Sequence, residues 1–272
     1  MVSYGPPGEA SRLSAAAALV RRNDPDRFLT ALFAPAERRE TLFVLYAFNH
    51  ELARARAAVS EPMLALIRLQ WWREVVNGEH RRHEIADPLG AALDAGSLDR
   101  NDLGAMIDAR EAEVEPIPTL AAWREYLEGA AGSLAVAAGR FLGAPSPEQL
   151  RGPGAAYGAA CVLRNAPALA RRQHSLLPAD VLARHGLSVE AAIAAPIAPA
   201  ALAAMAELAA IARTWLPSPD APRLPRHARA AALPAVLARR DLGRIPPLSI
   251  ERGLGDRLAV MRAGGLGGAS LI

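Results

Sequence analysis

The sequence lacks several residue types on which whole classes of protein depend. It has a single cysteine, Cys161, and no lysine among its 272 residues. One thiol cannot close a disulfide within the chain, and it cannot supply the cysteine set of a structural zinc site. Aromatic residues make up only 5% of the chain, and its 31 basic residues, all arginine, are scattered. We therefore expect no disulfide framework, no cysteine-based zinc site and no nucleic-acid partner.

Long apolar runs are missing as well. The longest uncharged segment, from Ala191 to Ala206, is interrupted by two prolines, and a membrane-spanning helix needs about 20 apolar residues. Near the start of the chain, Glu9 and Arg12 precede a short apolar run, an order that differs from that of a secretory signal. The abundance of alanine, glycine, proline and arginine is typical of a bacterium with a GC-rich genome. We expect a bacterial cytoplasmic protein. The sequence also allows peripheral contact of this protein with the inner face of the inner membrane.

Helical patterning dominates what the sequence does contain. Apolar residues recur at steps of three and four, as in Leu202, Met205 and Leu208, and no segment alternates cleanly as a strand would. The helices carry so few polar residues that they must be buried on several sides. The sequence predicts an all-α, single-domain helical bundle around a central cavity over residues 1–262, then a frayed glycine-rich tail over 263–272. Helices are expected at 10–22, 37–57, 62–77, 99–114, 119–143, 147–171, 189–195, 200–216, 227–239 and 249–262.

Two of these helices carry a family resemblance. The first contains Tyr46-Ala-Phe-Asn-His-Glu-Leu-Ala-Arg-Ala-Arg-Ala57, and the second contains Leu163-Arg-Asn-Ala-Pro-Ala-Leu-Ala-Arg-Arg, followed by Leu177-Pro178. Both resemble the two signature helices of the squalene/phytoene synthase family of head-to-head prenyltransferases. The similarity extends over roughly residues 24–262. It implies an isoprenoid-synthase type of all-helical fold.

The resemblance also shows what has been replaced. Enzymes of that family place aspartates in these two helices, where paired carboxylates hold Mg²⁺ ions that draw off a diphosphate group. Here the first pair of positions is occupied by Ala53 and Ala57, and the second by Asn165 and Leu169. Alanine and leucine cannot ligate a metal ion. The resemblance therefore implies no metal cofactor and no metal-dependent ionisation, with Mg²⁺ required only if other carboxylates substitute.

One acidic group could in principle substitute. Asp108, Glu111 and Glu115 follow one another at steps of three and four on a predicted helix, so they share a face. The alternative is a solvated acidic face that pairs with Arg110 or Arg124.

Polar and aromatic residues near the signature helices form the remaining candidates. They could line a residual pocket for an anionic head group or lipid, or form a structural network in which Arg164 or Arg172 pairs with Glu51. Two adjacent tryptophans point about 100° apart on a helix, so we expect one in the core and the other on a partner or membrane surface. The candidate pocket residues are Asn49, Glu51, Arg68, Gln70, Arg164, Arg171 and Arg172, and the tryptophans are Trp71 and Trp72.

Several motifs in order narrow the resemblance. They are Asp24–Pro35, Ala47–Ala53, Val59–Pro62, Ile67–Arg73, Ile107–Arg110 and Leu163–Pro167. Together they resemble the branch of the superfamily that contains mitochondrial respiratory complex I assembly factor six and its alphaproteobacterial relatives. The branch implies a non-catalytic accessory protein that binds a complex I subunit, an assembly intermediate, or an isoprenoid or phospholipid. The alternatives are a prenyltransferase of the squalene or phytoene synthase type with an altered metal site, and an isoprenoid or lipid carrier.

Overall fold

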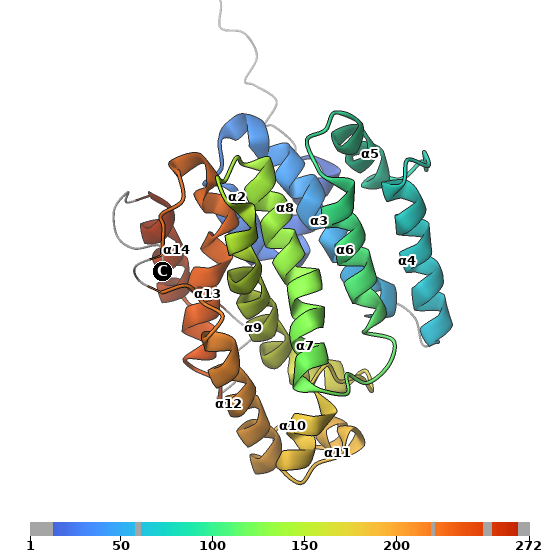
Figure 1. Ribbon diagram of the computed structural model, residues 1–272, viewed down its shortest axis with the longest axis vertical. Helices are drawn as coiled ribbons and strands as arrows, with labels where there is room; N and C mark the ends of the chain where they lie inside the picture. Colours follow the sequence, from blue (N-terminus) through green and yellow to red (C-terminus); the bar gives the residue numbers. More distant parts are fainter. Residues whose placement is uncertain (1–12, 58–60, 219–220, 247–251, 266–272) are drawn as a thin grey trace, which may run out of the picture.

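Helices form the regular structure of this chain in a computed structural model that describes residues 13–57, 61–218, 221–246 and 252–265. No strand occurs in those ranges, which confirms the predicted all-α class. Figure 1 shows the helices running side by side, with α4 at one edge of the bundle and α14 at the opposite edge. The α-helices are α1 (Ala15–Asn23), α2 (Pro25–Ala31), α3 (Arg39–Ala57), α4 (Pro62–Val76), α5 (Ala86–Asp94), α6 (Arg100–Glu111), α7 (Leu120–Leu127), α8 (Ser133–Phe141), α9 (Arg151–Ala170), α10 (Ala179–Arg184), α11 (Val189–Ala194), α12 (Pro199–Arg213), α13 (Leu233–Leu242) and α14 (Leu254–Gly265).

The long helix α9 forms the centre of the bundle. It packs against α13, α12, α8 and α7, which come from both earlier and later parts of the chain. Small residues on α9 allow this close approach, because a Cβ added at Gly154 would lie 2.7 Å from the backbone oxygen of Ala131. Pro167 lies inside α9, and the helix continues past it to end at Ala170.

A π-helical turn interrupts the helix opposite α9. The predicted helix over 119–143 is present as α7, the π-helical turn η2 (Glu128–Gly132) and α8 in direct succession. Turns of this kind are uncommon and often occur at functional sites. Ala130 and Ala131 in η2 line the cavity described below.

Three short helices were missed from the sequence. In α5, Pro88 and Gly90 look like breakers, but a proline in the first turn removes an N–H that has no helical partner anyway. His83 Nδ1 accepts hydrogen bonds from the Ile85 and Ala86 N–H groups at 3.1 and 3.3 Å, so the start of α5 has a cap outside the usual set. Helix α10 spans six residues, too few to show a periodicity. The segment Pro25–Ala31 was not predicted as a helix either, and it forms α2.

The aspartate beside Pro25 caps a helix. Asp24 is the N-cap of α2, and its carboxylate accepts from the Arg27 N–H at 3.0 Å. At the other end of the chain, α14 continues through Gly265, so part of the predicted tail is helical. Residues 266–272 of that tail lie outside the described residues. Within the described ranges, every helix is too short or too polar to cross a membrane.

Candidate functional site

A cavity of about 640 Å³ lies between α3 and α9. Ala53 on α3 lines it from one side, and Asn165 and Leu169 on α9 line it from the other. These are three of the four positions at which the resemblance places metal-binding aspartates. The fourth, Ala57, is the last residue of α3. The cavity reaches solvent at Asn165, whose side chain is exposed and donates to the Cys161 carbonyl at 2.9 Å.

One end of the cavity is closed by an arginine held between two tyrosines. The Arg27 guanidinium lies over the Tyr157 ring at 4.8 Å and the Tyr46 ring at 5.9 Å, measured to the ring centroids. It also forms an ion pair with Asp24 at 2.8 Å. Burial raises the pKa of Tyr46 to about 12, so its hydroxyl stays neutral. The Asp24 carboxylate is thus already paired with a cationic side chain, that of Arg27.

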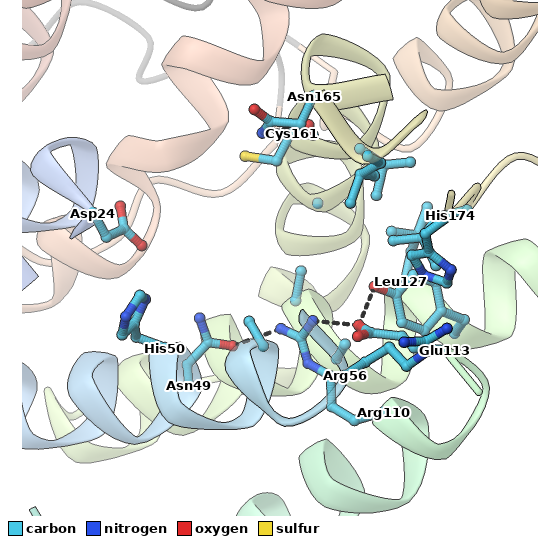
Figure 2. A pocket seen from close by; sticks show the side chains of 18 of the residues that line it. Asp24, Asn49, His50, Arg56, Arg110, Glu113, Leu127, Cys161, Asn165 and His174 are labelled. Carbon is cyan, nitrogen blue, oxygen red and sulfur yellow. Dashed lines mark hydrogen bonds and ion pairs between the residues drawn. The ribbon is translucent and has the colours of Figure 1, made fainter. Parts of the chain in front are cut away.

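A second carboxylate of the cavity is also ion-paired with an arginine. Glu113 is buried, and it accepts from Arg110 at 2.5 Å and from the Tyr126 hydroxyl at 2.7 Å. Arg110 also donates to the Asn49 side-chain oxygen at 3.1 Å, which ties α6 to α3. Burial and the neighbouring Glu113 charge raise the pKa of Tyr126 well above its usual value. Figure 2 shows Arg110 in the middle of this network, with Glu113 on one side and Asn49 on the other.

Arg56 and His174 lie beside Glu113, at the opposite end of the cavity from Asp24 and His50 (Figure 2). Burial and the nearby Arg56 charge lower the pKa of His174, so its imidazole is neutral at pH 7. Burial likewise lowers the pKa of His50.

A strained turn after α9 presents the last polar groups of the cavity. The N–H of His174 donates to the Leu169 carbonyl at 3.1 Å, and the N–H of Gln173 donates to the Ala170 carbonyl at 2.9 Å. This pair of bonds is a Schellman motif, which needs a left-handed residue at the position of Gln173. Gln173 adopts a φ of 55°, a region that glycine occupies more easily. The turn places Arg172 and His174 against the cavity.

Apolar side chains form the rest of the lining. They are Leu127, Ala130, Ala131, Val162, Leu169 and Leu176. Cys161 lies among them, and burial raises the pKa of its thiol to about 11. The thiol is therefore protonated at neutral pH, which is the state of a packing residue and not of a nucleophile.

The cavity does not fit a divalent metal. Its two carboxylates, Asp24 and Glu113, lie at opposite ends, and arginines neutralise both. Among the described residues, no three histidine, cysteine, aspartate or glutamate side chains come together in a group that could hold a metal ion. We therefore derive no step of chemistry through a metal at this site.

The sequence model for squalene/phytoene synthase matches residues 20–247. The chain belongs to the squalene/phytoene synthase family. Solved structures of family members share its fold. A dehydrosqualene synthase in complex with ligand covers 91% of this chain and 93% of its own length, with a TM-score of 0.71 at 14% identity. The squalene synthase HpnC from Alicyclobacillus acidocaldarius covers 85% of this chain and 91% of its own, with a TM-score of 0.64 at 14% identity.

Relatives with higher sequence identity have a different name. "NADH dehydrogenase (ubiquinone) complex I, assembly factor 6" from Homo sapiens is 30% identical over 181 residues, which is 63% of this chain and 54% of that protein. The homologue from Drosophila melanogaster is 29% identical over 191 residues, 64% of this chain and 57% of that protein. The chain thus spans a little over half the length of the curated relatives it matches.

The structure brings only some of the predicted pocket residues to the cavity of this family member. Asn49 and Arg172 line it. Glu51 lies on α3 and pairs with Arg54 at 2.9 Å. A pairing of Glu51 with Arg164 or Arg172 was one of the two alternatives that the sequence left open. Arg68 and Gln70 are exposed on α4, and Arg171 is exposed after α9.

Arg164 belongs to a buried ion cluster between α2, α9 and α13. It pairs with Asp241 at 3.2 Å, and Arg252 pairs with Asp241 at 2.5 Å and with Asp26 at 2.6 Å. The Tyr157 hydroxyl donates to Asp26 at 2.9 Å. Two carboxylates and two arginines balance here, so the cluster is a structural polar network. Asp26 therefore links distant parts of the chain.

The acidic face of α6 has a partner that the sequence did not reveal. Arg73 of α4 forms ion pairs with Asp108 and, at 2.7 Å, with Glu111, and Glu115 is exposed beyond them. We expected Arg110 or Arg124 instead, but Arg110 pairs with Glu113 and Arg124 pairs with Glu128. The difference arises because α4 packs against α6, which no local pattern indicates.

The two tryptophans of α4 differ in burial. Trp72 is buried against Phe48, with ring centroids 5.4 Å apart, whereas Trp71 is only partly buried. The two preceding turns of α4 expose Met63 and Ile67, which are 64% and 58% accessible. Because Met63, Ile67 and Trp71 are spaced by four residues, they form one stripe, which we call the α4 face.

Sequence reasoning missed most of the ionisable residues that line the cavity. These are Arg27, Arg56, Arg110, Glu113 and His174. A signal existed for Arg56, which lies three residues after Ala53 and so on the same face of α3. No local signal marks the others.

Proposed function

We propose that this family member acts by binding, without metal-dependent chemistry, as an assembly or accessory factor for respiratory complex I. The observation that supports the first part is the cavity itself, where Ala53, Asn165 and Leu169 stand at positions that need carboxylates. The relatives named as complex I assembly factor 6 support the second part. Under this proposal the protein works in the cytoplasm, in peripheral contact with the inner membrane.

The α4 face is the surface we propose for the partner subunit. Its apolar residues, Met63, Ile67 and Trp71, lie beside the exposed Arg68 and Glu61. An anionic membrane would favour a surplus of positive charge, whereas a protein partner tolerates both signs. We therefore propose a protein occupant for this face.

Deletion of the gene tests the proposal. The deletion strain should lose assembled complex I, measured as NADH:quinone activity and as the intact complex on native gels, and the wild-type gene should restore it. A variant altered only on the α4 face, with Ala53, Ala57 and Asn165 left unchanged, should fail to restore the complex. If it restores complex I, the assignment of this surface to the partner is contradicted. Full assembly in the deletion strain would overturn the assembly role itself.

A further inference from the structure

Helix α14 exposes apolar side chains along its outer side. Leu254, Leu258 and Met261 are each more than half exposed. They follow one another at steps of four and three residues, so they lie in one row on the helix. We call these three residues the α14 face. Single exposed apolar residues are common on proteins, whereas a row of large ones usually marks an interaction site.

The opposite side of α14 is fixed to the bundle. Val260 is fully buried in a core cluster to which α13 also contributes. Asp256, one turn earlier, is buried as well, and it forms ion pairs with Arg240 at 2.6 Å and with Arg244 at 2.9 Å. The α14 face is therefore directed outward for as long as the fold is intact.

The exposed charges beside the α14 face are all positive. Arg257 and Arg262 are exposed on α14 itself, one on each side of the apolar row. The carboxylates of α13 and α14, those of Asp241 and Asp256, are buried and paired with arginines. Within these two helices, the charges that reach solvent are therefore those of arginines only.

The α4 face is surrounded by a different set of charges. Glu61 and Arg68, which have opposite signs, are both exposed beside it. The headgroups of an anionic bilayer attract arginines, each of which raises the affinity about five-fold, and they repel carboxylates. An apolar row with a basic residue on either side is the pattern of a helix that lies in a membrane interface. The charge on α14 thus complements a lipid surface, and the charge beside α4 does not.

We propose that the α14 face docks this protein on an anionic lipid bilayer. Leu254, Leu258 and Met261 enter the boundary between headgroups and acyl chains, and Arg257 and Arg262 contact the lipid phosphates. A helix of 12 residues is about 18 Å long, so α14 lies along the surface and does not cross the bilayer.

The docking leaves the other edge of the molecule accessible. Helix α4 lies at the opposite edge of the bundle (Figure 1), so its face points away from the lipid and toward the partner subunit. The inference rests on the proposed function only in placing the protein at a membrane. It adds the surface that makes the contact and the chemistry of the lipid.

Co-sedimentation of the purified chain with lipid vesicles tests the proposal. One set of vesicles contains phosphatidylglycerol and phosphatidylcholine in equal parts, and the other contains phosphatidylcholine alone. We expect binding to the anionic set to be at least about 10-fold tighter, because two arginines lie beside the apolar row. Sodium chloride at high concentration should reduce this difference, since salt screens exposed charges.

Three glutamate variants assign the binding to one face. Leu258→Glu places a carboxylate in the apolar row and should weaken binding to the anionic vesicles about 10-fold or more. Ile67→Glu makes the same change on the α4 face, where Ile67 is 58% exposed and Leu258 is 53% exposed. Ile197→Glu makes it between α11 and α12, outside both faces. The last two variants should change the affinity less than about two-fold, because their charges lie farther from the lipid than a Debye length.

A double variant tests the contribution of charge. Arg257→Gln combined with Arg262→Gln keeps the apolar row, and it should reduce the preference for anionic over neutral vesicles to less than about three-fold. Both arginines are exposed, so the fold should tolerate their loss. Circular dichroism and thermal denaturation check that every variant folds.

Several outcomes would overturn the proposal. Absence of binding to both sets of vesicles would exclude lipid docking by this chain, and equal binding to both would mean adsorption without headgroup contact. Loss in Ile67→Glu but not in Leu258→Glu would place the lipid contact on the α4 face. Self-association without lipid that Leu258→Glu abolishes, measured by analytical ultracentrifugation, would assign the α14 face to a second copy of the chain. Because the vesicles contain no complex I subunit, lipid binding can fail while assembly still depends on the gene, and the reverse also holds.

Discussion

At the scale of single residues, the sequence indicated some positions of the cavity but few of the charged groups that line it. The resemblance fixed Ala53, Asn165 and Leu169 as replaced carboxylate positions, and the structure places all three on one cavity. Of the charged residues that line the cavity, only Arg172 was among the predicted pocket residues. Arg110 reaches Asn49 across 61 residues of sequence, and such a contact depends on how α6 packs and not on any local pattern.

The thiol of Cys161 offers a first prediction. Burial raises its pKa from 9.0 to about 11, so at pH 8 the reactive thiolate is about 100-fold scarcer in the folded chain than in the unfolded one. Alkylation by iodoacetamide at pH 8 should be slower by at least that factor without urea than in urea. The rate should rise with pH toward 11. Equal rates with and without urea would contradict the buried, protonated state of this thiol.

The buried ion cluster around Asp241 allows a second prediction. Asp241 is the shared partner of Arg164 and Arg252, and all three side chains are largely buried. Asp241→Ala leaves both arginines without that partner, so the free energy of unfolding should fall by about 3–5 kcal/mol. Urea denaturation measures the loss. The control is Asp94→Ala, which removes an exposed pair with Arg100 and should cost less than about 1 kcal/mol. Similar losses in the two variants would show that the cluster contributes no more than a surface pair.

At the scale of the elements, periodicity located the long helices and failed at short ones. The segments at 37–57, 62–77 and 147–171 correspond closely to η1 (Ala36–Arg38) with α3, to α4, and to η3 (Pro147–Leu150) with α9. The missed helices α5 and α10 are short, and tertiary contacts or an unusual cap support them. The π-helical turn η2 was also missed, because α7, η2 and α8 follow one another directly and the sequence predicts them as one helix.

The close packing of α9 on η2 yields a third prediction. A Cβ at Gly154 would lie 2.7 Å from the Ala131 carbonyl oxygen and 2.7 Å from the Ala135 Cβ. Neither neighbour can move easily, so Gly154→Ala should reduce the free energy of unfolding by about 1–3 kcal/mol.

Gly104 in the interior of α6 provides the matched control. Nothing lies within 4 Å of a Cβ built there. Gly104→Ala should therefore stabilise the chain by about 0.5–1 kcal/mol through helix propensity alone. Denaturation curves of both variants give the comparison, and stabilisation by Gly154→Ala would show that α9 and η2 are less closely packed than described.

At the scale of the whole molecule, the fold was predictable, whereas only Trp71 or Trp72 was predicted for the surface that we propose as the α4 face. Two ordered motif helices sufficed to indicate the family, because the fold depends on the spacing and burial of long helices rather than on the catalytic carboxylates. Exposed apolar residues gather on opposite edges of the bundle, on α4 and on α14 (Figure 1). Which helices form the edges follows from the three-dimensional arrangement, and no sequence pattern distinguished those faces from buried ones.

The α4 face allows a fourth prediction. Ile67→Glu places a charge on that face and should reduce the ability of the gene to restore complex I in the deletion strain by several-fold. Ile197→Glu makes the same change outside the α4 and α14 faces, where Ile197 is 66% exposed and Ile67 is 58% exposed. We expect it to restore assembly fully. Equal loss in both variants would point to a general effect of surface charge.

The central claim is that the protein acts by binding and that its cavity does not ionise a diphosphate substrate. Its most direct test is the release of diphosphate from farnesyl and geranylgeranyl diphosphate by the purified protein with Mg²⁺, beside an active squalene or phytoene synthase. The account predicts release no greater than in a metal-free control, because Ala53, Asn165 and Leu169 provide no carboxylate for the metal. Release well above that control would contradict it, and would direct the search for metal ligands to Asp108, Glu111 and Glu115.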